Sequence, residues 1–470
     1  MSNDTMTPDK KLAKGEARCP GAPSTQEIIS ADAVAAPKWV RSESYHFLGD
    51  EDIPKDRYID AAYAKREYDT LWKKTWQFAC REEHIPQVGD YHVYDLGPYS
   101  FIITRVAANE IRAYYNACLH RGTKLRASGT EGNAEEFKCS FHGWSWNLDG
   151  SHKNTVCDWD FPHVDPKKFA LPQARVETRW GFVFINMDLS APSFADYVGA
   201  EACSHFDNWK LEDRSIYLHV KKRIPCNWKL AIDAFLEAYH VIETHPQVAP
   251  SNADANSQYD FYGEHVNRFI SPLGVVSPHL YGKVSEQDIL DQFTLGDSSA
   301  MGDTRLKLEE GSTARAMMAK MFRKMFEQAS GADLSTMSDS ELLDAFSYTI
   351  FPNVFLWPGI SLPLVYRFRP DPRDHRWCIY EVMFMKPVPP GSTRPMPADP
   401  IVLGDHQSFC EAAGMDPGFG LILDQDTENL ILQQEGLEAS AKPGLTLGNY
   451  QEIRVRHFQR AVDKYVGSQP

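Results

Sequence analysis

The stretch from residue 116 to residue 146, NACLHRGTKLRASGTEGNAEEFKCSFHGWSW, decides how the rest of the chain is interpreted. It contains Cys118-Leu-His120, then eighteen residues, then Cys139-Ser-Phe-His142. Each half offers one thiol and one imidazole, and a nearby glycine lets the backbone approach an inorganic core closely. Two such turns can present four ligands to one small metal centre, so the sequence predicts a metal site here.

The order of the ligands indicates which centre this is. A structural zinc site usually pairs like ligands, whereas each half of this motif mixes one cysteine with one histidine. The mixed order suits a two-iron, two-sulfide cluster in which one iron takes both cysteines and the other takes both histidines. Histidine ligation raises the reduction potential above that of an all-cysteine cluster. Zinc at these residues, or a chance cluster without any metal, are the alternatives.

The motif is flanked by short segments rich in β-branched and aromatic residues. Gly, Pro and Asn breaks separate these segments, which is typical of a small antiparallel β-domain. The clearest of them are GDYHVYDLG (89–97), YSFIITRV (99–106), IRAYYNAC (111–118) and GFVFINMD (181–188).

A second constellation lies in NWKLAIDAFLEAYHVIETHP, residues 227–246. On a helix, Glu237 and His240 are three residues apart and share a face. His245 lies off that face, but the residue before a proline avoids the helical conformation, so the helix should end before Pro246. His245 can then lie beside His240, and two imidazoles with one carboxylate make the ligand set of a mononuclear iron(II) oxygenase.

The carboxylate has several candidates. Asp233 shares a face with His240, and we expect it to have a structural or supporting role. The segment LDQDTENLILQQEGL (423–437) contains Asp424, Asp426, Glu428 and Glu435. These acids are otherwise expected to form the solvated face of a helix, and the residues alone do not choose among them.

The flanks CLHRG and CSFHGWSWNLDG closely resemble the alpha subunits of Rieske non-haem iron aromatic-ring-hydroxylating oxygenases, and residues 227–246 resemble the mononuclear iron motif of that family. This resemblance covers roughly residues 60–460. It implies a Rieske [2Fe-2S] cluster on Cys118, His120, Cys139 and His142. It also implies Fe(II) on His240, His245 and a third ligand.

The resemblance selects Asp426 as that third ligand, because Gln434 and Gly436 match a family Gln-x-Gly turn that follows the acidic ligand at a fixed distance. Asp424 is the next candidate. Asn227 matches a family asparagine near the iron, for which a catalytic role is expected.

Glu237 stands where many family members have aspartate. The resemblance implies that this acid hydrogen-bonds both His240 and the cluster residue His142 of a neighbouring subunit. It would orient both rings and bridge the electron path.

The implied protein is the terminal oxygenase component, which takes electrons from NAD(P)H through a reductase, with or without a ferredoxin. It would insert oxygen from O2 into an apolar aromatic or alicyclic substrate by hydroxylation or cis-dihydroxylation, as in aromatic hydrocarbon catabolism. One alternative is oxidative demethylation of a quaternary ammonium or O- or N-methyl substrate, and another is a Rieske electron-transfer protein without oxygenase activity. A homotrimer (α3) or an α3β3 assembly follows from the family.

The expected fold class is α+β, with a small all-β Rieske domain and a larger catalytic domain whose antiparallel sheet wraps around a long helix in a helix-grip-like arrangement. The expected divisions are a flexible tail over 1–36, a segment packing on the catalytic domain over 37–75, the Rieske domain over 76–190 and the catalytic domain over 191–470. Helices are predicted over 59–78, 228–242, 315–328, 423–436 and 451–466, and strands over 215–224, 347–368 and 376–387.

Composition limits the remaining possibilities. The 49 basic and 64 acidic residues give a net charge of −15, which argues against nucleic-acid binding. The sequence has no run of about 18 apolar residues and no secretory signal, so we expect a cytoplasmic protein without a membrane span.

Residues 285–345 are expected to form either a lid or plain surface. The candidates for an apolar pocket, each equally compatible with core packing, are Phe235, Leu236, Met318, Phe322, Phe351, Val354, Phe355 and Trp357.

Overall fold

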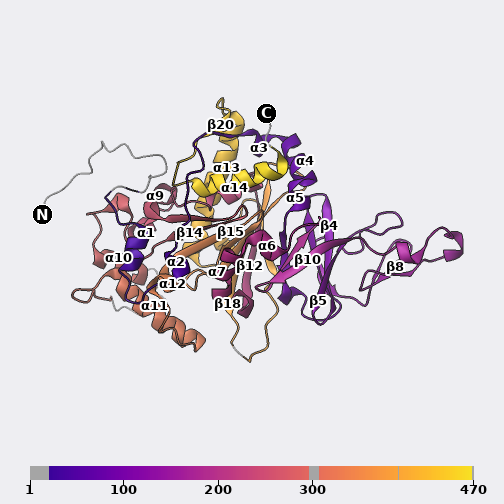
Figure 1. Ribbon diagram of the computed structural model, residues 1–470, viewed down its shortest axis with the longest axis horizontal. Helices are drawn as coiled ribbons and strands as arrows, with labels where there is room; N and C mark the ends of the chain where they lie inside the picture. The colour runs from indigo at the N-terminus through magenta and orange to yellow at the C-terminus, as the bar shows by residue number, and fades with distance from the viewer. Residues whose placement is uncertain (1–18, 20, 296–305, 390, 468–470) are drawn as a thin grey trace.

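The computed structural model describes residues 19, 21–295, 306–389 and 391–467. Within these residues a seven-stranded sheet has the order β2-β11-β10-β5-β4-β3-β6, and every neighbouring pair is antiparallel (Figure 1). Its strands are β2 (Gln77–Arg81), β3 (Asp90–Leu96), β4 (Tyr99–Ala107), β5 (Glu110–Tyr115), β6 (Glu131–Asn133), β10 (Gln173–Arg179) and β11 (Phe182–Asn186). The predicted small antiparallel β-domain is therefore present.

A three-stranded sheet extends this part of the molecule. Its strands are β7 (Glu136–Lys138), β8 (Ser145–Asn147) and β9 (His152–Asn154). Figure 1 shows β8 near one end of the long axis of the molecule. The loop between β7 and β8 holds the second half of the Cys-His motif, so the motif lies toward this end.

The larger sheet has eight strands in the order β13-β14-β15-β16-β17-β18-β12-β19. Neighbouring strands are antiparallel except β12 and β19, which are parallel. The strands are β12 (Arg214–Ile224), β13 (Gln258–Tyr262), β14 (Val266–Ser271), β15 (Ala345–Ile350), β16 (Val354–Trp357), β17 (Leu364–Pro370), β18 (Cys378–Pro387) and β19 (Pro400–Leu403). The strands predicted over 215–224, 347–368 and 376–387 fall in this sheet.

Three helices position the second constellation on the large sheet. α8 (Trp228–Ala234) contacts β17 and β18, and α13 (Pro417–Ala439) lies against α8. α14 (Ile453–Val466) contacts β13 and β14. The mixed helix-and-sheet fold class is confirmed, with a long helix, α13, carried above the antiparallel sheet (Figure 1).

The helix predicted over 423–436 is longer than expected, and its predicted end is wrong. Asp416 caps the start of α13 through the Phe419 N–H, and Pro417 occupies the first turn, where its missing N–H costs nothing. Gly436 keeps a helical backbone and has no positive φ, so it does not terminate the helix. A glycine inside a helix costs only about 1 kcal/mol relative to alanine, and tertiary packing overrides that cost.

The prediction of a flexible tail over residues 1–36 is wrong for residues 21–36. Helix α1 (Thr25–Ser30) begins at a Ser24 capping box, and Thr25 Oγ1 donates a 2.7 Å hydrogen bond to the Asn256 carbonyl. Asp32 forms a buried 2.7 Å ion pair with Arg315. These long-range contacts order a segment whose composition alone indicates disorder. Residues 1–18 and 20 lie outside the described residues.

The single helix predicted over residues 59–78 is replaced by three short helices and a strand. They are α3 (Asp56–Ile59), α4 (Ala61–Asp69) and α5 (Leu71–Lys74), followed by β2. Trp72 packs on Trp228 with ring centroids 4.9 Å apart, which attaches this segment to α8. The turn between β3 and β4 also contacts this segment. Gly97 in that turn lies so close to the Tyr68 ring that there is no room for a Cβ atom.

The helix predicted over 315–328 is confirmed as α11 (Ala314–Ser330). It packs with α10 (Glu286–Leu295) and α12 (Asp339–Leu343) around a core cluster of its own, which contains Met318. Residues 296–305 of the expected lid lie outside the described residues. In the part of the chain that is described, no helix combines the length and the apolar character that crossing a membrane requires.

Candidate metal and cluster sites

The two halves of the Cys-His motif fold into turns of the same construction. In the first, the Gly122 N–H donates to the Cys118 carbonyl at 2.9 Å, and in the second the Gly143 N–H donates to the Cys139 carbonyl at 3.1 Å. Gly122 has φ +79° and Gly143 has φ +75°, which is the left-handed region that glycine adopts most readily. Each turn therefore reverses the chain sharply just after its cysteine and histidine.

The two turns bring the four side chains together. The ring centroids of His120 and His142 lie 4.7 Å apart, and Trp144 stacks on His120 at 5.0 Å. Cys118 and Cys139 are buried. Burial raises the pKa of Cys118, the Cys139 thiol raises it further, and the Cys118 thiol helps to lower the pKa of Cys139. Two thiols and two imidazoles in adjoining turns are the donor set of a Rieske-type cluster, so these residues fit one.

Backbone donors favour the thiolate form of Cys139. Burial raises the pKa of this thiol, but the backbone N–H groups of Phe141 and His142 lower it, and the net pKa lies below the ordinary value. Iron ligation requires the thiolate, so the turn supports the cysteine in its ligating form.

The second constellation also comes together, although the helix predicted over 228–242 is wrong. α8 ends at Ala234, and a separate helix, α9 (Val241–Thr244), follows six irregular residues. The break occurs where the Glu237 carboxylate accepts the His240 backbone N–H at 3.0 Å and satisfies a donor at the start of α9. α9 then ends before Pro246, and His245, with φ −124° and ψ 55°, lies outside the helical region that a residue before proline avoids.

His240, His245 and Asp426 form one group. His245 Nε2 lies 2.9 Å from Asp426 Oδ1, His240 Nε2 lies 3.5 Å from the same oxygen, and one ligand atom from each residue falls within 4.8 Å of the others. Asp426 and His245 are buried, whereas the His240 side chain is one quarter exposed. Two imidazoles and a carboxylate suit a mononuclear iron(II) centre that keeps open coordination positions.

Each histidine of this group is oriented by an outer hydrogen bond. His240 Nδ1 lies 2.6 Å from Glu237 Oε1, and His245 Nδ1 lies 2.9 Å from Gln425 Oε1. With Nδ1–H donating outward, each ring points its Nε2 atom toward Asp426, where a bound metal ion would take the place of an Nε2 proton. Burial lowers the pKa of His240, but the Glu237 charge and hydrogen bond and the Asp426 charge raise it to about 9. No role was predicted for Gln425 from the sequence, in which the only signal of one was its position beside Asp426.

The remaining acids have other partners. Asp424 accepts hydrogen bonds from Ser408 Oγ and from the Phe409 N–H at 2.8 Å, which removes it from the metal group. Asp233 accepts from Tyr58 at 2.7 Å and from Gln459, and burial raises its pKa to about 7. The expected supporting role of Asp233 agrees with these contacts.

The structure places Asn227, for which a catalytic role was predicted, at the start of α8. Asn227 caps α8, with Oδ1 accepting from the Lys229 N–H at 3.1 Å and Nδ2 donating to the His375 carbonyl at 2.9 Å. It does not line the cleft beside His240 and Asp426. A buried amide needs partners, and the Lys229 N–H and the His375 carbonyl supply them.

An aromatic wall lies next to the metal group. The Phe235 ring lies 5.0 Å from Tyr366 and 5.6 Å from Tyr380, and Asp426 raises the pKa of both tyrosines, after the larger effect of burial. Phe355 belongs to the same core cluster. The predicted pocket residues Met318 and Phe322 belong instead to the separate α10–α12 cluster, so they do not contribute to this wall.

A cleft of about 640 Å³ is lined by His240 and Asp426 together with Glu237. Tyr239 at its edge is 57% exposed. The metal group is therefore accessible from the surface of the single chain.

The fold and the two donor sets define a chain with a Rieske-type domain and a two-histidine, one-carboxylate catalytic domain. The Rieske [2Fe-2S] domain family matches residues 75–161, and the ring hydroxylating alpha subunit (catalytic domain) family matches residues 201–468, which is more than half of the chain. The chain belongs to the ring-hydroxylating alpha subunit family, which joins a Rieske [2Fe-2S] domain to the catalytic domain of the mononuclear iron oxygenases.

The chain covers about half the length of the curated relatives that it matches. The biphenyl 2,3-dioxygenase subunit alpha of Rhodococcus jostii (strain RHA1) is 32% identical over 213 residues, which is 43% of this chain and 46% of that protein. The carnitine monooxygenase oxygenase subunit of Escherichia coli (strain K12) is 32% identical over 206 residues, or 42% of this chain and 53% of that protein.

Solved structures share the fold over most of the chain. A quaternary ammonium Rieske monooxygenase has a TM-score of 0.61 at 18% identity, covering 88% of this chain and 95% of that one. Naphthalene 1,2-dioxygenase from Rhodococcus sp. has a TM-score of 0.59 at 19% identity, covering 89% and 95%.

Proposed function

We propose that this chain is the terminal oxygenase component of a Rieske non-haem iron oxygenase, with His240, His245 and Asp426 as the protein ligands of Fe(II). The observation that carries the proposal is the meeting of these three side chains, from segments 181 residues apart, within 4.8 Å. A Rieske protein that only carries electrons does not need a second metal-binding group of this kind. When bound, the iron supplies the site at which dioxygen is activated.

Cys118 and Cys139 would hold one iron of the cluster, and His120 and His142 the other. Electrons would come from NAD(P)H through a reductase, with or without a ferredoxin. We propose that the reaction takes place in the cytoplasm, where NAD(P)H is available.

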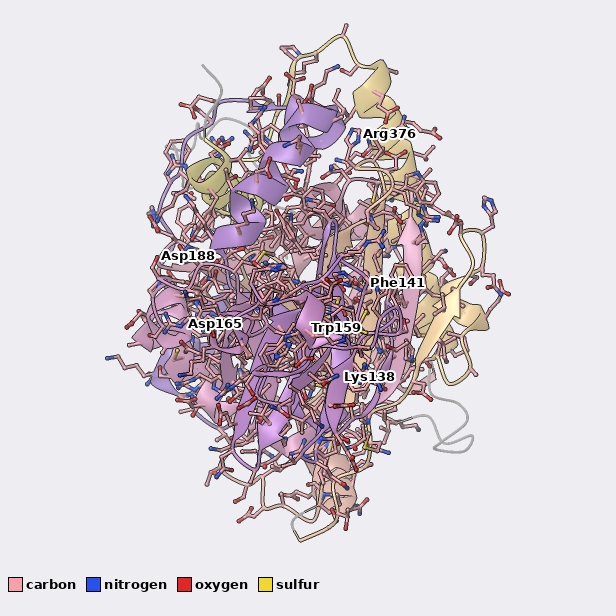
Figure 2. The ribbon with its side chains drawn as sticks, turned by 90° about the vertical axis from the view of Figure 1, so that its right-hand side faces the viewer. Lys138, Phe141, Trp159, Asp165, Asp188 and Arg376 are labelled. Atoms are coloured by element: carbon pink, nitrogen blue, oxygen red, sulfur yellow. The ribbon has the colours of Figure 1, made fainter. Side chains whose placement is uncertain are left out.

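The arrangement supports electron transfer between subunits. In Figure 1, β8, next to the cluster turns, and α9, next to His240, lie far apart along the long axis of the chain. His142 is exposed, and its neighbour Phe141 is 58% exposed. Trp159, which is 78% exposed, lies with Phe141 on the end of the molecule seen in Figure 2. We infer that this apolar end docks on the cleft of a second copy, within a homotrimer (α3) or α3β3 assembly.

In that assembly Glu237 would connect the two centres. Its Oε1 holds His240 Nδ1, and it lines the cleft that a neighbouring His142 would enter. The carboxylate would accept a hydrogen bond from each histidine, fix both rings and join the electron path.

For the substrate we propose an apolar aromatic or alicyclic compound, to be hydroxylated or cis-dihydroxylated against the Phe235 wall. Aromatic rings next to the metal group favour flat apolar molecules. The same wall favours a second candidate, a quaternary ammonium compound, because aromatic faces also attract cations. Relatives of both kinds, biphenyl dioxygenase and carnitine monooxygenase subunits, match the chain at 32% identity.

The test is a single turnover by chemically reduced, iron-loaded protein with O2 and either biphenyl or carnitine. We expect product from the wild type and from Asp424→Ala, because the Asp424 carboxylate accepts hydrogen bonds from the Ser408–Phe409 turn and does not belong to the metal group. Asp426→Ala should give no product. Full turnover by Asp426→Ala would refute the assigned ligand, and the substrate that is oxidised decides between the two classes.

A further inference from the structure

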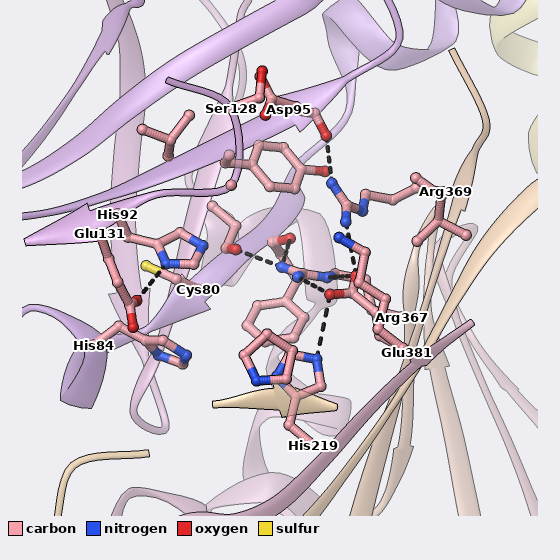
Figure 3. A pocket seen from close by; sticks show the side chains of 18 of the residues that line it. Cys80, His84, His92, Asp95, Ser128, Glu131, His219, Arg367, Arg369 and Glu381 are labelled. Carbon is pink, nitrogen blue, oxygen red and sulfur yellow. Dashed lines mark hydrogen bonds and ion pairs between the residues drawn. The ribbon is translucent and has the colours of Figure 1, made fainter. Parts of the chain in front are cut away.

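A second cavity lies between the two large sheets, separate from the cleft beside His240. Its volume is about 510 Å³. One wall comes from β2, β3, β6 and the single turn η1 (Glu82–His84), and the opposite wall comes from β12, β17 and β18 (Figure 3). Neither the oxygenase reaction nor the cluster uses any residue of this cavity.

Three metal-ligating side chains converge in it. His84 ends η1, His92 lies on β3 and Glu131 lies on β6, and one ligand atom from each falls within 4.8 Å of the others. The ring centroids of His84 and His92 are 5.1 Å apart. His92 and Glu131 are paired directly across the β3–β6 ladder, so backbone hydrogen bonding holds two of the three in register.

The backbone and the burial of these rings leave lone pairs for a ligand. His84 Nδ1 lies 3.2 Å from the Arg81 carbonyl and 3.3 Å from the Arg81 backbone nitrogen. In the tautomer whose Nδ1–H donates to the carbonyl, the Nε2 lone pair is available. Burial lowers the pKa of both histidines, and for His84 the neighbouring His92 and His219 lower it further. Neutral imidazoles are the form that binds metal.

A fourth residue faces the group from the catalytic sheet. His219 on β12 is only 6% exposed, and neither of its ring nitrogens has a hydrogen-bond partner in the described part of the chain. Its Nε2 lies 3.3 Å from Glu381 Oε1 as an ion-pair contact. Nδ1 is thus the ring nitrogen without either kind of partner among the described residues, and an unsatisfied buried nitrogen is costly.

We propose that His84, His92 and Glu131 bind a divalent transition-metal ion of the zinc class in this cavity, which His219 also lines. Two imidazoles and one carboxylate form a protein ligand set found in zinc sites, and imidazole suits zinc, nickel and copper alike. The ion would fasten the three-residue strand β6 to β3 and η1. This inference does not depend on the proposed oxygenase reaction.

The test uses full-length, cluster-loaded protein carrying His240→Ala, which removes one ligand of the iron site. Equilibrium dialysis against Zn²⁺, followed by metal analysis, measures zinc per chain in this background alone and with His84→Gln, His92→Gln or His406→Gln. His406 is an exposed histidine and serves as the matched control. The visible spectrum of the cluster reports that each variant has folded.

We expect about one zinc ion per chain in the background and in the His406→Gln control. Loss of an outer hydrogen-bond partner already costs 10–100-fold in metal affinity, so removing His84 or His92 should weaken zinc binding at least about tenfold. Equal zinc binding in all four proteins, or none in any, would overturn the proposal and leave only a hydrogen bond between His92 and Glu131.

A measurement on the wild type covers the case in which the variants do not fold. Crystals of the iron-loaded protein soaked in Zn²⁺ would be measured at the zinc absorption edge. An anomalous peak between His84, His92 and Glu131 supports the site, and the absence of a peak there contradicts it.

Discussion

The Nδ1 atom of His245 lies 2.9 Å from Oε1 of Gln425, the residue immediately before Asp426 on α13. The same glutamine oxygen accepts a hydrogen bond from Gln247 at 2.7 Å. One helix therefore supplies both a proposed iron ligand and the acceptor that orients a second ligand. This arrangement couples the position of α13 to the geometry of the metal group.

Replacing Gln425 should weaken iron binding. Gln425→Leu keeps the size of the side chain but leaves the His245 ring without its acceptor, so iron affinity should fall about 10–100-fold. The measurement is iron retained after dialysis against a graded chelator series. Gln433→Leu, an exposed position on the same helix, is the control and should retain iron like the wild type. Equal retention by both variants would show that Gln425 does not orient the ligand.

Glu237→Gln should separate electron transfer from metal binding. The amide offers one acceptor where the carboxylate uses two, to the His240 N–H and to Nδ1, and it carries no charge. We expect activity to fall about 10–100-fold while cluster and iron contents stay close to wild type. Glu243→Gln, on α9 and lining the same cleft, should be active. Matching activities of the two variants would argue against a bridge at Glu237.

The buried Asp260–Arg268 pair should dominate the local stability of the large sheet. Both side chains are fully buried, and Asp260 Oδ2 lies 2.7 Å from Arg268 Nη2. Asp260→Ala leaves an uncompensated buried guanidinium, which costs about 3–5 kcal/mol in the free energy of unfolding. Asp69→Ala removes the exposed Lys65 pair instead and should leave the urea midpoint unchanged. A comparable midpoint for both variants would contradict this reasoning.

The protein should lose stability between pH 6.5 and pH 4, partly through His457. Burial lowers the pKa of His457 from 6.5 to about 4, so over this interval the unfolded chain binds a proton that the folded chain does not. Stability therefore falls as the pH falls. In His457→Gln this loss should be smaller, and the stability difference from wild type should shrink on acidification. Unfolding midpoints across the pH range test this, and a constant difference would refute it.

Much of the fold was predictable because it rests on local signals. The β-branched segments around the Cys-His motif became the strands of the small sheet, and the proline after His245 ended α9 as expected. The helix break at Glu237 was not predictable from periodicity, because a side chain replaces a helical backbone acceptor there. The order of residues 21–36 likewise depends on partners such as Asn256 and Arg315, hundreds of positions away.

The candidate sites also divide into parts that local sequence signals predict and parts that depend on long-range contacts. The Cys-His turns are contained in short stretches, and their spacing alone indicated a cluster. Asp426 needed the family register, because Asp424 has the same charge and lies on the same helix. The Gln425 contact spans 180 residues, and His84, His92 and Glu131 come from three separate elements. Spacing in the sequence does not reveal convergence of this kind.

The most direct test of the account is iron and acid-labile sulfide per chain, measured on wild type and His240→Ala purified without oxygen. A Rieske centre accounts for two irons, so the account predicts about three irons and two sulfides in the wild type, and about two of each in His240→Ala. Two irons in the wild type that persist under iron loading would mean an electron carrier without an oxygenase site. Zinc without sulfide would contradict the cluster itself.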